Sequence, residues 1–150
     1  MYCCLIIQGT EVAFITDRIV INPNNEELMI ATLHKGFCLC ASFHMFQEFN
    51  AYRYEEDAVY EGTSEGTSEG VITSCPGHAV VITGYGTTPS GKKFWWIKNS
   101  WGDGWGDKGF GKLYRGSDAF NPRTGRRDLN LLFDVIACIR IEFSPVSQTL

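Results

Sequence analysis

His78 and Asn99 form a residue pair that could act as a base and its orienting partner. His78 begins the apolar run H-A-V-V-I-T-G-Y-G at 78–86, and Asn99 directly follows the run W-W-I-K at 95–98. A histidine can accept a proton near neutral pH, but only a ring held in one orientation and tautomer does so efficiently. An asparagine oxygen can accept from one ring nitrogen without adding charge, which leaves the other nitrogen for a nucleophile.

The two apolar runs are predicted to pair as an antiparallel hairpin. The segment between them, residues 87–92, is rich in Pro, Ser and Gly and favours a turn. Pairing brings His78 and Asn99 together, and Trp101 just beyond could shield their hydrogen bond from water. The alternative is that His78 is an ordinary core histidine and Asn99 a turn residue, with no chemistry between them.

The rest of the chain predicts one helix and several strands. The helix is expected over residues 24–36, capped by Asn24, with Glu27 completing a capping box and Gly36 ending it. Segments rich in β-branched and aromatic residues predict strands at 10–21, 36–43, 109–116 and 131–143, with a shorter strand-like A-V-Y-E-G at 58–62. Tandem GTSE repeats at 61–70 contain no apolar residue and predict a loop insertion.

Length and charge exclude several classes of partner. The 150 residues fit one domain, and the net charge of −4 gives no reason to expect nucleic acid or an anionic membrane. The short basic cluster at 123–127 is interpreted as a solvated loop. No apolar run approaches the roughly 20 residues that span a bilayer. The segment M-Y-C-C-L-I-I at 1–7 lacks the features of a signal peptide, so the compartment stays open.

Four possible metal ligands occur as H-x3-C-x-C-x3-H, namely His34, Cys38, Cys40 and His44. Cys38 and Cys40 would share one face of a strand, so zinc coordination is conceivable. Zinc sites usually take C-x2-C pairs on turns, however, and C-x-C within an apolar strand is more typical of a core. The sequence therefore favours no metal at these residues.

The string around the hairpin resembles the papain-like cysteine peptidases. The matching residues are Gly77–Val81, Gly84–Gly86, Trp96–Gly102, Gly104–Gly106 and Gly109–Gly111. A weaker likeness extends over about residues 12 to 116. The resemblance implies an α+β fold, the β-rich antiparallel right-hand lobe of a two-lobed enzyme, with one or two short helices. That half would occupy residues 12–143, between an unassigned N-terminal extension (1–11) and a C-terminal tail (144–150).

By this resemblance each residue near the hairpin ends takes a role in peptide-bond hydrolysis. His78 would be the catalytic base and acid, Asn99 would orient its ring, and Trp101 would cover their hydrogen bond. Ala79 would line the pocket for the second substrate residue, and the Gly77 backbone would face the substrate chain. The resemblance implies a polypeptide substrate and no cofactor.

The nucleophile of the family has no match in this sequence. The family motif is C-G-[SA]-C-[WY], with its histidine about 130–150 residues downstream. Only 77 residues precede His78, and none of the six cysteines is followed by an aromatic residue. No glutamine stands six residues before a cysteine. We therefore expect both the nucleophilic cysteine and the oxyanion-hole glutamine to lie outside these residues, in a left-hand lobe.

Two interpretations of the chain follow, and the sequence does not choose between them. It is either a fragment of a peptidase that is inactive by itself, or a non-catalytic homologue that binds peptides or regulates. A small metal-binding β domain is a third, less favoured one. The resemblance also suggests a disulfide between Cys75 and Cys138, because some family members place a bridge there; free buried thiols are the alternative.

Overall fold

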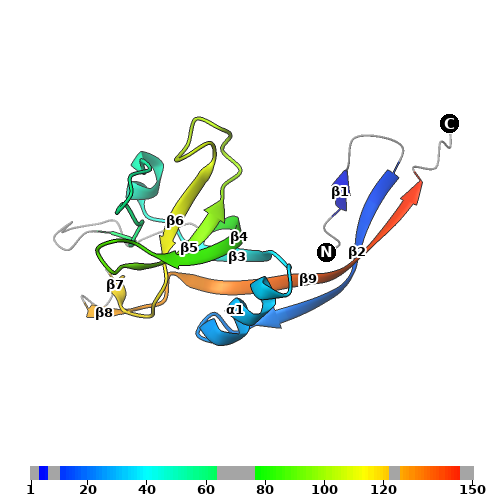
Figure 1. The fold of residues 1–150 in the computed structure, drawn as a ribbon, viewed down its shortest axis with the longest axis horizontal. Coiled ribbons are helices and arrows are strands. Elements are labelled where there is room, and N and C mark those ends of the chain that lie inside the picture. Colours follow the sequence, from blue (N-terminus) through cyan, green and yellow to red (C-terminus); the bar gives the residue numbers. More distant parts are fainter. Residues whose placement is uncertain (1–3, 7–10, 64–76, 122–125, 146–150) are drawn as a thin grey trace.

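A seven-stranded antiparallel sheet organises the chain (Figure 1), which is described here from a computed structural model covering residues 4–6, 11–63, 77–121 and 126–145. The strand order is β1-β2-β9-β3-β4-β5-β6, and β7 and β8 form a separate small ladder. The strands are β1 (Cys4–Ile6), β2 (Glu11–Ile21), β3 (Leu39–His44), β4 (Gly77–Thr87), β5 (Lys93–Lys98), β6 (Phe110–Tyr114), β7 (Ala119–Asn121), β8 (Arg126–Leu129) and β9 (Leu132–Pro145).

The long strand β9 joins the two parts of the sheet. Its first residues pair with β3, from Leu132 to Ala137, and the stretch from Val135 to Pro145 pairs with β2. In Figure 1 the β2–β9 ribbon extends away from the rest of the molecule and carries β1 on its outer edge. The predicted strands at 10–21 and 131–143 are confirmed, and β1 lies within the segment that the sequence left unassigned.

The helix α1 (Glu26–His34) begins one residue later than the sequence suggested. Asn25 caps it, because its side-chain oxygen accepts from the Leu28 N–H at 3.0 Å. Asn24 was the predicted cap, but its side chain instead accepts from Asn130 Nδ2 at 2.9 Å. Gly36 follows the last turn with φ +86°, the left-handed conformation expected of a glycine that ends a helix. The helix packs against the sheet through Met29, which is fully buried.

An aromatic segment that follows β3, residues 45–63, closes one end of the core. It contains the short 3-10 helix η1 (Gln47–Ala51), in which Phe49 is fully buried. The expected strand at 58–62 is reduced to isolated bridges, from Tyr60 to Leu113 and from Gly62 to Phe120. The GTSE repeats fall mostly in residues 64–76, outside the described part of the chain. No helix among the described residues has the length and hydrophobicity that crossing a membrane requires.

Candidate active site

The β4–β5 hairpin brings His78 and Asn99 into direct contact. The two strands are antiparallel, with Val81 opposite Lys98, so the start of β4 lies beside the end of β5. His78 Nε2 lies 2.8 Å from Asn99 Oδ1, within hydrogen-bond distance. The contact expected from the hairpin is therefore present.

The partners of Asn99 fix the tautomer of the His78 ring. The backbone N–H of Ser100 lies 2.8 Å from Asn99 Oδ1 and can only donate, so the atom at this position is the amide oxygen. The same oxygen is an acceptor toward His78, which requires the ring to carry a proton on Nε2. In the neutral ring Nδ1 then holds the lone pair, and Nδ1 has no hydrogen-bond partner among the described residues. This is the arrangement in which a histidine can take a proton through Nδ1.

The loop after β5 holds Asn99 rigidly. Asn99 is only 3% exposed, and its backbone N–H donates to the Gly109 carbonyl at 2.8 Å. The Gly109 N–H in turn donates to the Trp105 carbonyl at 2.7 Å. Gly106 makes this close return possible, since a Cβ there would lie 2.1 Å from the carbonyl oxygen of Phe110. One donor is left over: Asn99 Nδ2 is buried and has no acceptor within the described part of the chain.

Three aromatic rings surround the His78 imidazole. The Trp101 ring centroid lies 4.9 Å from it, and those of Phe43 and Phe49 both lie at 5.7 Å. Trp101 is the outer ring, 40% exposed, whereas Phe43 and Phe49 are fully buried. Trp101 also meets Phe49 edge-on at 5.4 Å, so the three rings form one packed cluster. Apolar walls of this kind exclude water and strengthen the His78–Asn99 hydrogen bond.

Sequence reasoning missed Phe49 as a site residue. Phe49 is far from His78 in sequence and reaches it only because η1 folds against the sheet. The aromatic density of residues 44–60 was the available signal, but it does not say which ring meets the histidine. Trp105 holds Phe49 in place, since its indole Nε1 donates to the Phe49 carbonyl at 3.1 Å.

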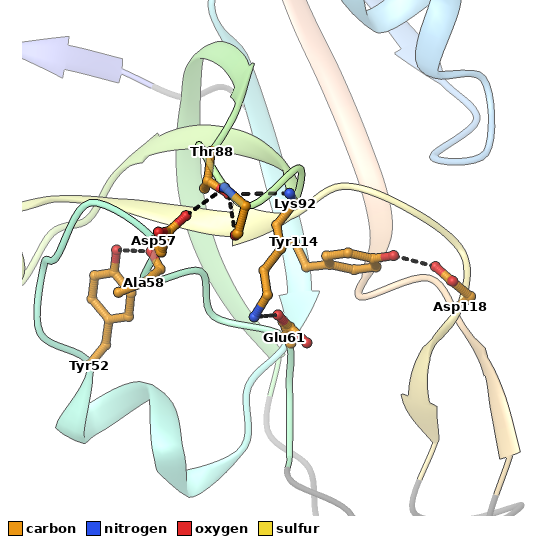
Figure 2. Close-up of polar contacts among 9 residues, drawn as sticks. Tyr52, Asp57, Ala58, Glu61, Thr88, Lys92, Tyr114 and Asp118 are labelled. Carbon is orange, nitrogen blue, oxygen red and sulfur yellow. Dashed lines mark hydrogen bonds and ion pairs between the residues drawn. The ribbon is translucent and has the colours of Figure 1, made fainter.

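A buried tyrosine supports this aromatic cluster from behind. The Tyr52 ring stacks on Trp105 with centroids 5.1 Å apart. Its hydroxyl accepts from the Lys112 backbone N–H at 3.1 Å and donates to the Ala58 carbonyl at 3.2 Å, the second contact being drawn in Figure 2. Burial raises the pKa of Tyr52, so the hydroxyl stays a neutral donor. These hydrogen bonds connect the aromatic cluster to β6 and to the segment that follows η1.

The residues assigned to the substrate side lie exposed at the start of β4. Gly77 and Ala79 flank His78, and both are solvent-exposed. Gly77 sits close against Phe133, because a Cβ at Gly77 would lie 3.0 Å from the tip of that ring. The substrate-side roles expected of Gly77 and Ala79 therefore stay predictions.

None of the described cysteines meets His78. Phe43 is opposite His78 in the β3–β4 ladder, and Cys40, three residues earlier, therefore projects from the other face of the sheet. Cys38 precedes β3, and Cys138 lies on β9 without a disulfide to any described cysteine. Cys75 lies outside the described residues, so a bridge between Cys75 and Cys138 stays a prediction.

The four possible zinc ligands do not converge. His34 Nε2 lies 2.7 Å from the Tyr85 hydroxyl, and the His44 ring packs on Phe133 at 4.9 Å. Among the residues with described positions, no group of three or more His, Cys, Asp or Glu side chains could hold a metal ion. The metal-binding interpretation therefore finds no support in the geometry.

Comparison with known proteins identifies the family. A family model described as papain family cysteine protease matches residues 4–125. The chain belongs to this family. In the papain-family gut-specific cysteine proteinase of Caenorhabditis elegans, 38% of 96 aligned residues are identical, and in ananain of Ananas comosus 34% of 103. These alignments cover 64% and 69% of this chain but only 26% of each relative, so the chain spans a minor part of their length.

Solved structures of papain-family proteases share the fold. The bromelain protease from Ananas comosus, solved in complex with the E64 inhibitor, superposes with a TM-score of 0.56 and 26% identity. That match covers 85% of this chain and 52% of the bromelain chain. A recombinant stem bromelain precursor gives a TM-score of 0.59 and 28% identity, over 82% of this chain and 35% of the precursor. The antiparallel sheet is thus the β-rich lobe of the papain-like fold.

Proposed function

We propose that this chain supplies the base half of a papain-like cysteine peptidase site. His78 is the general base and acid, Asn99 orients it, and the nucleophilic cysteine comes from a left-hand lobe outside these 150 residues. The observation that carries the proposal is the 2.8 Å contact between His78 Nε2 and Asn99 Oδ1, which leaves Nδ1 as the proton acceptor. A thiol brought to Nδ1 would lose its proton to the ring and become a nucleophilic thiolate.

The exposure of Trp101 also supports a covering partner. The Trp101 side chain is 40% exposed, and its ring contacts the His78 imidazole. A left-hand lobe packed against this side of the molecule would cover Trp101.

The first test is the activity of the chain alone. We expect no detectable hydrolysis of peptide substrates that papain-family enzymes cleave, because loss of the nucleophile from a comparable triad costs on the order of 10⁶ in rate. The measurement is release of a fluorescent leaving group under reducing conditions, with a complete papain-family protease as positive control. Turnover that needs a free thiol and disappears on alkylation would contradict the proposal and would place a nucleophile among the six cysteines.

A second candidate function is peptide binding without catalysis. It is favoured by the exposed start of β4, where Gly77 and Ala79 flank His78, whose ring contacts the exposed Trp101. An extended peptide laid along this edge should change the fluorescence or the indole NMR signal of Trp101 in a saturable way. If the chain alone binds such peptides tightly, and a joined left-hand lobe gives no hydrolysis, the binding module is the better account.

A further inference from the structure

A charged cavity opens at the far end of the β4–β5 hairpin from His78. Its volume is about 590 Å³, and Lys92 and Lys93, next to the hairpin turn, help to line it. Thr87, which pairs with Lys93, lies nine residue steps along β4 from His78, and at about 3.3 Å per step this is a path of up to roughly 30 Å. The cavity therefore stands apart from the candidate active site.

The carboxylates that line the cavity all have partners. Glu61 pairs with Lys92, and Asp118 accepts from the Tyr114 hydroxyl, as Figure 2 shows. The third carboxylate, Glu26, lies 3.3 Å from Arg115 Nη1. Glu61 and Glu26 are thus paired with cations, whereas Asp118, whose partner is a neutral hydroxyl, keeps its negative charge.

Two cationic side chains of the cavity, Arg115 and Lys93, have N–H groups without an acceptor among the described residues. The Arg115 side chain is only 10% exposed, and its guanidinium lies over the rings of Tyr85 and Trp95, 5.4 Å from each centroid. Its Nε is buried and has no acceptor among the described residues. Lys93 is exposed at the rim and forms no ion pair in the part of the chain that the structure describes. Arg127 also lines the cavity, but it has an interaction partner of its own.

The shape of the wall suits a small ligand. At Gly116 a Cβ would lie 2.9 Å from both the Tyr114 hydroxyl and Asp118 Oδ1, so any side chain there would fill this corner. The lining carries four cationic and three acidic side chains, one net positive charge on a chain whose net charge is −4. A rigid, stacked arginine with a spare N–H and a nearby ammonium is a good receptor for an oxyanion.

We propose that this cavity binds a small oxyanion, for which the Arg115 guanidinium and the Lys93 ammonium provide the cationic contacts. The shared chemistry is a compact group of anionic oxygens, which a sulfate, a phosphate or a carboxylate can supply. The site is independent of His78 and Asn99. A negative result for oxyanion binding would therefore not bear on the proposed peptidase role.

The test is an NMR titration of the ¹⁵N-labelled chain at low ionic strength with sodium sulfate, sodium phosphate and sodium acetate, and with sodium chloride as the ionic-strength reference. We expect saturable shifts of the Gly91, Lys93, Arg115 and Gly116 amides with at least one oxyanion and none with chloride. The three salts distinguish a sulfate or phosphate group from a carboxylate. Amide shifts that rise linearly with the concentration of every salt, chloride included, would show that the cavity has no oxyanion site.

Two substitutions make the assignment specific. Lys93→Gln removes an exposed charge and should weaken binding by about threefold, the scale of one exposed ion contact. Arg115→Gln should abolish saturation, provided that circular dichroism shows an intact fold. Lys35→Gln, on the exposed residue after α1, makes the same charge change away from the cavity and should leave binding unchanged. Equal effects of Lys93→Gln and Lys35→Gln would show a general charge effect and would overturn the proposal.

Discussion

At the residue scale, the orientation of His78 depends on a neighbour that carries no charge. Asn99 Oδ1 accepts from both Ser100 N–H and His78 Nε2, each at 2.8 Å. The backbone donor fixes which amide atom faces the ring, and the ring must then keep its proton on Nε2. An aspartate would hold the ring equally well but would add a negative charge beside it.

The first prediction concerns this tautomer. In the folded chain, long-range ¹H–¹⁵N correlation spectra should show neutral His78 almost entirely protonated at Nε2. Asn99→Ala removes the acceptor and should give a mixture of the two tautomers. His34, which contacts Tyr85 and not Asn99, is the internal control and should be unaffected. An Nδ1-protonated ring in the unsubstituted chain would contradict the assigned role of Asn99.

The second prediction concerns Tyr114 and alkaline pH. A hydrogen bond to Asp118, together with burial, raises the pKa of Tyr114 from 10.0 to about 12. Because the raised value favours the protonated hydroxyl in the folded chain, this contact stabilises the fold below about pH 10, and its contribution is lost as the pH rises toward 12. Tyrosinate absorbance near 295 nm, taken as the difference between wild type and Tyr114→Phe, should titrate near 12.

Asp118→Asn is the matched control for that titration. It keeps the size of the side chain but removes the carboxylate, so the Tyr114 pKa should fall toward 10. A difference titration centred near 10 in the unsubstituted chain would show that the Tyr114–Asp118 contact is not formed in solution.

The residues of the candidate site differ in how far sequence could predict them. His78, Asn99 and Trp101 occur in one continuous motif string, and a hairpin with a short turn brings them together by local pairing alone. Phe49 could not be predicted, because its contact with His78 depends on how η1 packs against β3 and β4. A contact between segments that are distant in sequence has no characteristic residue spacing from which it could be predicted.

At the element scale, helix and strand types were predictable while exact boundaries were not. The pattern at 24–36 correctly predicted a helix, but the cap is Asn25 and not the predicted Asn24. Asn24 instead accepts a hydrogen bond from Asn130, in the segment before β9. A tertiary contact therefore accompanies a boundary one residue away from the one that the local sequence predicted.

This choice gives the third prediction. Asn25→Ala should lower the free energy of unfolding by about 1 kcal/mol, the usual cost of losing an N-cap side chain. Asn24→Ala removes only an exposed side-chain contact and should cost clearly less. Urea unfolding followed by circular dichroism measures both. A larger loss for Asn24→Ala would restore the cap that the sequence alone suggested.

The fourth prediction tests η1 as the inner support of the site. Phe49 contacts Phe43, Tyr60, His78, Trp101 and Trp105 and is fully buried. Phe49→Ala should cost about 3–5 kcal/mol of stability and should also alter the emission of Trp101, which loses its edge-on neighbour. Phe133→Ala, at a residue that is 48% exposed, is the control and should cost much less. Equal losses would mean that η1 does not pack as described.

At the scale of the whole molecule, the chain corresponds to about half of a papain-family structure. The superposition on the bromelain protease covers 85% of this chain and 52% of the bromelain chain. The right-hand half of such an enzyme packs against its left-hand half over an interface, and interfaces between domains of one chain typically bury about 600–1,500 Å². Without that cover, apolar side chains such as Trp101 remain exposed.

The fifth prediction follows from this exposed side. The chain alone should bind a hydrophobic dye and should self-associate with rising concentration, because apolar patches beyond a few hundred Å² are unusual on soluble monomers. Light scattering and dye fluorescence measure the two effects, and Trp101→Ser should reduce both. A dye-negative monomer with a cooperative thermal transition would mean that the chain has become a self-sufficient domain.

The most direct test of His78 as the catalytic base joins this chain to a left-hand lobe. A left-hand lobe from a papain-family relative, carrying its own C-G-S-C-W segment, would be fused ahead of residue 12 of this chain. We expect the fusion to hydrolyse peptides in a thiol-dependent way, and His78→Ala or replacement of the lobe's cysteine by serine to abolish turnover. A fusion that folds cooperatively but shows no hydrolysis, or hydrolysis that His78→Ala leaves unchanged, would contradict the role of His78 as the base.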